Sequence, residues 1–124
     1  MKKWIISACL LMMQAGAWAK VTLPDIMSDN MVLQQQTEAC LWGKANANAE
    51  VTIRPSWNRE TYKVTADADG KWIAKIKTPT ASYNAYTISI SDGEEIILNN
   101  VLVGEVWFCS GQSNMEMPLR GFWN

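Results

Sequence analysis

The sequence predicts a mainly β fold, with an antiparallel β-sandwich in residues 20–103 and the first strand and turn of a truncated α/β domain in residues 104–124. Short segments with an apolar residue at every second position recur through the first region, and turn-forming residues separate them. No segment before residue 105 carries the apolar stripe of a helix over ten or more residues. From Gly104 the pattern changes to an uninterrupted apolar run that leads into a turn, which is typical of a strand buried on both faces.

Four strands are predicted from the alternation, at residues 51–57, 62–66, 72–77 and 86–91. Turns are expected at residues 43–48, 58–59, 67–70, 78–84 and 92–93. The Asp-Gly pairs in two of these turns are typical of β-hairpins. The acidic turn at 67–70 lacks the further ligands, the final glutamate and the flanking helices of an EF-hand, so we interpret it as a hairpin turn and not as a calcium site.

Three tryptophans are candidates for the core of the sandwich, namely Trp42, Trp57 and Trp72. A tryptophan buries a large apolar area while its N–H finds a partner at the edge of the core. The alternative is an aromatic platform on which a sugar stacks. Trp57 is the best candidate for this alternative, because it stands at a strand end beside Asn58 and Arg59.

The first 19 residues have the layout of a secretory signal peptide. Lys2 and Lys3 precede an apolar run at residues 4–13, and Ala17-Trp18-Ala19 forms a small-x-small cleavage site. The run is shorter than the roughly 20 residues that span a bilayer, so no stable membrane anchor is expected. Lipid attachment at Cys9 is a less favoured alternative. The sequence therefore predicts a secreted or periplasmic protein.

Charge and cysteine content exclude several classes of partner and site. Beyond residue 19 the count of Lys and Arg falls from 11 to 9 against 12 Asp and Glu, a net charge of about −3, and no basic patch suits a nucleic acid. Cys40 and Cys109 are interpreted as buried free thiols, although an exported compartment would permit a disulfide between them. With no histidine and no CxxC pair, the sequence predicts no metal site.

The run from Gly104 to Leu119, GEVWFCSGQSNMEMPL, is the part of the sequence that could carry chemistry. Residues 106–109 are expected to form a buried strand, and Gly111 permits a sharp turn after it. A serine beyond the carboxyl end of such a strand has an exposed hydroxyl, and its backbone N–H lies where it could stabilise an oxyanion. The G-x-S-x-G nucleophile elbow does not fit, because Met115 occupies the position of its second glycine. Taken alone, the residues favour a turn without chemistry.

The longer context resembles the sialate O-acetylesterase family, a branch of the SGNH hydrolases. The 16-residue run is similar to the block of that family around its nucleophile. Three further segments resemble family segments, and together the matches span essentially residues 21–121: LPDIMSDNMVLQQQ, CLWGKA at residues 40–45, and residues 67–72. The chain departs from the family pattern in two loops, at residues 46–49 and 81–86.

The resemblance implies a role for individual residues. Ser113 matches the nucleophilic serine, whose backbone N–H would also be an oxyanion donor, and Gly111, Gln112 and Asn114 match the turn that supports it. Ser110 matches no catalytic position. The family completes its site with an Asp-x-x-His pair far downstream and needs no metal or organic cofactor.

The resemblance and the composition together predict the N-terminal part of an exported serine esterase that removes O-acetyl groups from sialic acid or related glycans. A serine hydroxyl needs a base to take its proton, and these 124 residues contain no histidine, so we expect the fragment alone to be inactive. Glu116 is not expected to replace the histidine, because nothing orients it. The alternative is a non-catalytic β-sandwich module that binds a glycan or a protein. The sequence predicts no oligomeric state.

Overall fold

The computed structural model describes residues 20–111, which form seven β-strands and no helix. The strands are β1 (Val32–Gln34), β2 (Glu38–Lys44), β3 (Glu50–Pro55), β4 (Tyr62–Thr65), β5 (Lys71–Lys77), β6 (Ser82–Ser91) and β7 (Glu95–Gly104). The mainly β prediction is therefore confirmed for this part of the chain. Within it, no helix is long and apolar enough to cross a membrane.

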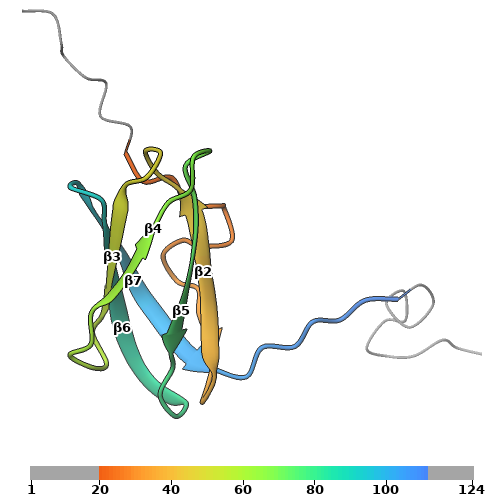
Figure 1. Cartoon of the computed structure of the whole chain (residues 1–124). Helices are drawn as coiled ribbons and strands as arrows, with labels where there is room; N and C mark the ends of the chain where they lie inside the picture. The colour runs from red at the N-terminus through yellow and green to blue at the C-terminus, as the bar shows by residue number, and fades with distance from the viewer. Residues whose placement is uncertain (1–19, 112–124) are drawn as a thin grey trace, which may run out of the picture.

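The strands form two sheets that lie one in front of the other (Figure 1). One sheet has five strands in the order β1-β7-β6-β3-β4, and the other pairs β2 with β5. Most neighbouring strands are antiparallel, as predicted, but β1 pairs with β7 in parallel. The sequence did not reveal β1, β2 or β7 as strands, because none of the three shows a long alternation of apolar and polar residues.

A single apolar core lies between the two sheets. The β2–β5 pair contributes Leu41, Trp72, Ala74 and Ile76, and the five-stranded sheet contributes residues that include Ile53, Ile88, Ile90 and Val101. Strand β5 shows how the sequence produces this arrangement. Its residues alternate strictly between exposed and buried along KWIAKIK, so its three apolar side chains at even positions all enter the core.

The predicted tryptophan core is only partly correct. Trp72 is 2% exposed, whereas Trp42 is 42% exposed, because it stands on the outward face of β2. Trp57 packs half-buried against the core, donates its indole N–H to the carbonyl oxygen of Lys77 at 2.9 Å, and meets the ring of Tyr86 edge to face. The bonded N–H and the packed ring make Trp57 a structural residue and do not support the sugar-platform alternative.

The turn at residues 67–70 is not a hairpin turn, as the sequence suggested, but a corner at which the chain passes from one sheet to the other. It connects β4 of the five-stranded sheet to β5 of the two-stranded sheet. One carboxylate oxygen of Asp67 accepts the backbone N–H groups of Asp69 and Lys71 at 2.9 and 2.8 Å, so the aspartate serves the backbone. The second Asp-Gly pair does form a hairpin, in which Ser91 of β6 pairs with Glu95 of β7.

Gly70 is required at the corner for two reasons. Its φ is +79°, and a Cβ atom at this position would overlap the carbonyl oxygen of Ala45. The approach is close because the backbone N–H of Ala45 donates to the carbonyl oxygen of Gly70 at 2.7 Å.

We expect Gly70→Ala to lower the free energy of unfolding by about 2 kcal/mol or more, since the strained φ and the steric overlap both act against the folded state. Urea denaturation followed by circular dichroism measures the change. Gly104→Ala is the matched control, because its Cβ would meet only Val32 at an ordinary 3.9 Å. Equal effects of the two substitutions would show that the corner does not need a glycine.

Candidate functional site

The candidate site begins where the chain leaves the β fold, just after β7 (Figure 1). Of the four residues expected to form the nucleophile turn, the structure describes Gly111, whereas Gln112, Ser113 and Asn114 lie outside the described residues. Gly111 has a φ of +135°, and a Cβ on it would meet nothing within 4 Å. Its backbone conformation, and not a lack of space, therefore favours glycine here.

Residues 106–109 do not form the buried strand that the sequence predicted. Val106, Trp107 and Phe108 are exposed to 52, 83 and 93%, and no strand is assigned between Glu105 and Gly111. The physical reason is that no other described strand lies beside this segment to pair with its backbone or cover its side chains. Three neighbouring large apolar side chains are thus left in contact with water, which is unusual unless another surface covers them.

A cluster of three polar side chains anchors the start of this segment. The Glu105 carboxylate accepts hydrogen bonds from the side-chain amides of Gln34 and Gln35, at 2.8 and 2.5 Å. In return, the side-chain oxygen of Gln34 accepts the backbone N–H of Val106 at 2.8 Å. We call these three residues, Gln34, Gln35 and Glu105, the exit clasp, because they fix the direction in which the chain leaves β7.

The exit clasp depends on two elements that hold the glutamines in place. Parallel pairing sets Gln34 opposite Gly104, and the backbone N–H of Gln35 donates to the Gly104 carbonyl oxygen at 2.8 Å. The hydroxyl of the buried Thr78 donates to the carbonyl oxygen of Gln34 at 2.6 Å and accepts the backbone N–H of Thr37 at 3.1 Å. The turn after β1 is therefore tied to the end of β5. The sequence did not reveal this cluster, because its hydrogen bonds join residues 70 and 71 positions apart.

Hydrogen bonding in the clasp favours the charged form of Glu105. The amide of Gln34, and next that of Gln35, lower the pKa of the Glu105 carboxyl below its ordinary value. Burial does not oppose them to any comparable extent, since the group is fully exposed. The clasp is consequently complete at neutral pH.

The remaining candidates for chemistry lie apart from this cluster. Cys40 and Cys109 are free, as expected, but both are exposed and not buried. Cys40 lies on the outward face of β2, and Cys109 belongs to the exposed segment after β7. Among residues 20–111, no group of three His, Cys, Asp or Glu side chains could hold a metal ion.

Comparison with known proteins identifies several that are similar to this chain in sequence. Sialate O-acetylesterases of Rattus norvegicus, Pongo abelii and Homo sapiens are 30, 33 and 32% identical to the chain, over 88, 79 and 79% of its length. The alignments cover 22, 20 and 20% of those proteins, so the chain spans about a fifth of the length of the curated relatives it matches. No protein-family model matches the chain.

A solved structure extends the similarity to three dimensions. The crystal structure of a carbohydrate acetylesterase from Xanthomonas citri superposes with a TM-score of 0.68 and 35% sequence identity, over 80% of this chain and 22% of that chain. The mainly β fold is thus shared with one part of a carbohydrate acetylesterase. The chain is therefore a homologue of sialate O-acetylesterases over most of its own length, and its β fold matches part of a carbohydrate acetylesterase.

The exit clasp predicts a pH-dependent signal. The side-chain amide resonances of Gln34 and Gln35 should shift with a midpoint below the pKa of a free glutamate, since these amides lower the pKa of Glu105. Because the folded-state pKa is lowered, the clasp stabilises the fold above the free value, and its contribution is lost as the pH falls through the Glu105 pKa.

Two-dimensional ¹⁵N NMR between pH 2 and 7 would follow these amides. Glu105→Gln should abolish the shift, whereas Glu94→Gln, in the β6–β7 turn, should leave it unchanged. A midpoint at or above that of a free glutamate would mean that the clasp does not form in solution.

Proposed function

We propose that this chain supplies the N-terminal β domain and the nucleophile of a serine esterase that hydrolyses O-acetyl esters on sialic acid or related glycans. The observation that carries the proposal is the similarity at 30–33% identity to proteins named sialate O-acetylesterase. The Xanthomonas citri carbohydrate acetylesterase supports the same substrate class. Because the chain matches about a fifth of each relative, the activity is assigned to a longer protein and not to the β domain alone.

Ser113 is the proposed nucleophile, on the resemblance of the run around it. Its hydroxyl attacks the acetyl carbonyl carbon, and the sugar oxygen leaves as the alcohol when it takes up a proton. Water then attacks the acyl-enzyme, which releases acetate and restores the hydroxyl. The Ser113 backbone N–H would donate to the oxyanion of each tetrahedral intermediate. Gln112 and Asn114 flank the nucleophile, and the positive φ of Gly111 supports a turn immediately before it.

The proton of the Ser113 hydroxyl needs a base from outside these 124 residues, because they contain no histidine. The exit clasp gives the β domain a role in this reaction. It fixes the start of the segment that leads to Ser113, and the exposed Val106, Trp107 and Phe108 are available to pack against further elements. We propose that the predicted boundaries hold: a β-sandwich in residues 20–103 and the start of an SGNH-type catalytic domain from residue 104.

Residues 1–19 are proposed to direct export, which would place the enzyme in the periplasm or outside the cell. Expression in a bacterial host with a functional secretion system should yield a processed protein that begins at Lys20, because cleavage follows Ala19. Intact-mass measurement of the periplasmic fraction checks the site, and Ala17→Lys should block processing. Recovery of only the unprocessed chain from the cytoplasm would contradict export.

The 124-residue polypeptide should show no hydrolysis of p-nitrophenyl acetate or O-acetylated sialic acid above the buffer rate, because its serine lacks a base. A longer protein that includes the Asp-x-x-His pair should hydrolyse both. In that protein, Ser113→Ala should lower kcat by a factor on the order of 10³ or more. Ser110→Ala is the matched control and should retain activity. Full activity in Ser113→Ala would exclude Ser113 as the nucleophile.

A further inference from the structure

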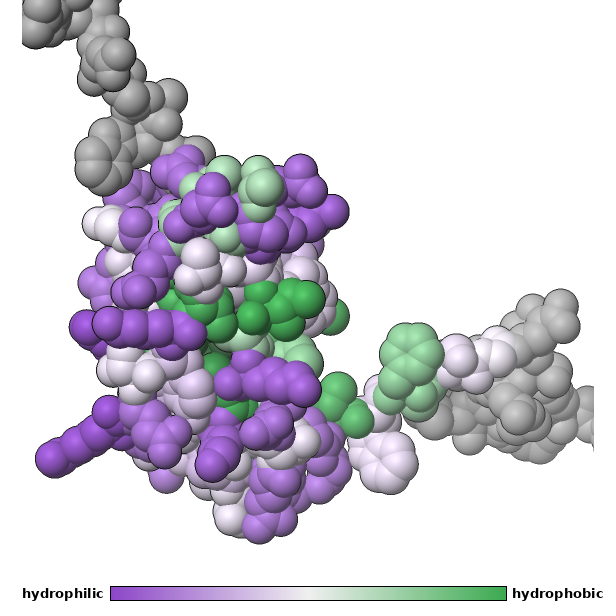
Figure 2. All heavy atoms as spheres, viewed as in Figure 1, coloured by the Kyte–Doolittle hydropathy of each residue, from purple (hydrophilic) through white to green (hydrophobic). Residues whose placement is uncertain are grey.

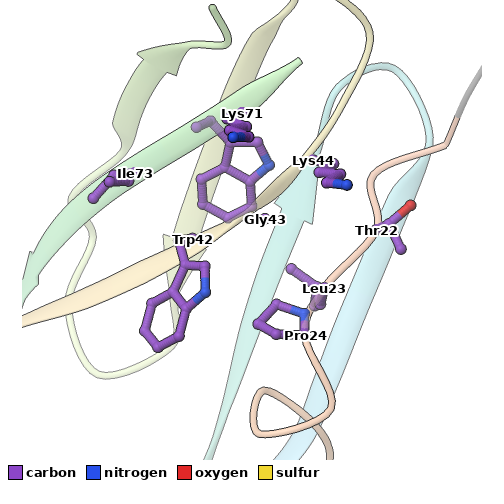
Figure 3. Close-up of a pocket in the computed structure, with 9 residues that line it drawn as sticks. Thr22, Leu23, Pro24, Trp42, Gly43, Lys44, Lys71 and Ile73 are labelled. Atoms are coloured by element: carbon purple, nitrogen blue, oxygen red, sulfur yellow. The ribbon is translucent and has the colours of Figure 1, made fainter. Parts of the chain in front are cut away.

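A hollow of about 420 Å³ opens between the β2–β5 sheet and the N-terminal segment that precedes β1 (Figure 3). Its volume lies within the range of about 300–1,000 Å³ that is usual for small-molecule sites. Leu23 and Pro24 line one side, Trp42 of β2 stands in the middle, and Ile73 of β5 lies on the other side. Lys44 and Lys71 complete one end of the lining.

The N-terminal segment is held beside β2 by backbone hydrogen bonds. Thr22 and Lys44 exchange two N–H to carbonyl bonds of 2.8 and 2.9 Å, which form an isolated antiparallel bridge. Gly43 permits this approach, because a Cβ on it would lie 2.5 Å from the carbonyl oxygen of Thr22. Backbone hydrogen bonds of the preceding residue therefore hold Leu23 and Pro24 at the side of the hollow.

The floor of the hollow is apolar and faces solvent. Trp42 and Ile73 stand directly opposite each other across the β2–β5 ladder, and they are 42 and 67% exposed. Figure 2 shows an apolar area on this face of the molecule, with hydrophilic residues on either side of it. An indole with neighbouring aliphatic side chains is a surface on which the C–H face of a sugar ring packs well.

Two ammonium groups border this apolar floor. Lys44 and Lys71 are also direct cross-strand neighbours, and like charges in this position are destabilising. Among the described residues, neither lysine has a carboxylate within 4 Å. Asp67 is near in sequence to Lys71, but its carboxylate accepts two backbone N–H groups of its own turn. An anion between the two ammonium groups would relieve their repulsion.

Beneath the floor lies a polar atom without a partner. The indole N–H of Trp72, which also lines the hollow, is buried and makes no hydrogen bond among the described residues. A buried donor without an acceptor is uncommon in folded proteins and destabilises them. Trp72 packs directly against Gly43, between the Trp42–Ile73 and Lys44–Lys71 pairs, so the unpaired donor lies beneath the hollow.

We propose that this hollow binds an acidic sugar, with the pyranose ring against Trp42 and the carboxylate between Lys44 and Lys71. The cationic end selects an anion, and the apolar floor selects a ligand with one apolar face. The preference for a sugar over another small acid rests on the proposed function. The binding itself needs neither Ser113 nor a catalytic base, so it can be tested apart from hydrolysis.

Titration of the ¹⁵N-labelled chain with the methyl glycoside of N-acetylneuraminic acid tests the proposal. We expect saturable shifts of the Trp42 indole N–H and of the Gly43 backbone N–H. The Lys44→Gln and Lys71→Gln double variant should bind at least about tenfold more weakly, because two charge-assisted contacts are lost. Trp42→Ala should weaken binding at least about fivefold, and circular dichroism would verify that each variant is folded.

Matched controls separate the acidic sugar from other occupants. Lys75→Gln with Lys77→Gln removes two charges from the same strand outside the hollow and should not change the affinity. The methyl ester of the same glycoside lacks the carboxylate charge and should bind as weakly as the double lysine variant. The proposal is overturned by an absence of saturable shifts, by equal binding of hexanoate and the glycoside, or by equal effects of the two lysine pairs. An esterase assay that fails leaves all of these readouts unaffected.

Discussion

The fold depends on the burial of one face of the β2–β5 pair against the five-stranded sheet. A two-stranded sheet is marginal by itself in water, and this pair becomes stable because its inward side chains share a core with the larger sheet. Leu41 and Ile76 have no exposed surface at all. Among residues 20–111, no further sheet or helix covers the outward face of the pair. Trp42, Ile73 and the two opposed lysines occupy that face, so the surface open to a ligand is a direct result of how the core closes.

A second constraint brings the two ends of the described chain together. Parallel pairing of β1 with β7 aligns residues that are 70 positions apart, which allows Gln34 and Gln35 to reach Glu105. Two hydrogen bonds reinforce this pairing just before β1 begins. The Asn100 side chain donates to the Asn30 side chain, and the Asn99 backbone N–H donates to the Asp29 carboxylate. Asn30 and Asn100 both have positive φ, a conformation that asparagine accepts more readily than most residues. The segment near the N-terminus therefore controls the direction in which the chain leaves the domain.

Sequence reasoning predicted the parts of this structure that local patterns determine. The strict alternation of β5 and the Asp-Gly turn after β6 identified those elements, because side-chain periodicity and turn chemistry are local properties. The parallel partner of β7 and the exposure of Trp42 could not be predicted, since both depend on which strands meet in space. The expected strand at 106–109 failed for the same reason: an apolar run pairs only when a neighbouring strand is present. Of the candidate site, Gly111 is described with the positive φ that a sharp turn requires, whereas Ser113 stays a prediction. The exit clasp arises from long-range hydrogen bonds that no local pattern reveals.

The clasp also sets a length scale. Six peptide units lead from Glu105 to Gly111, and a fully extended chain advances at most about 3.5 Å per residue, so the Cα atom of Gly111 stays within about 21 Å of the Cα atom of Glu105. A tether this short keeps whatever follows Gly111 at a high effective concentration near the β domain, on the order of millimolar for flexible linkers of similar reach. Under the proposed function, a weak contact between an acidic sugar and the hollow on the β domain would be enough to keep a glycan substrate close to the catalytic domain, without the slow release that tight binding imposes.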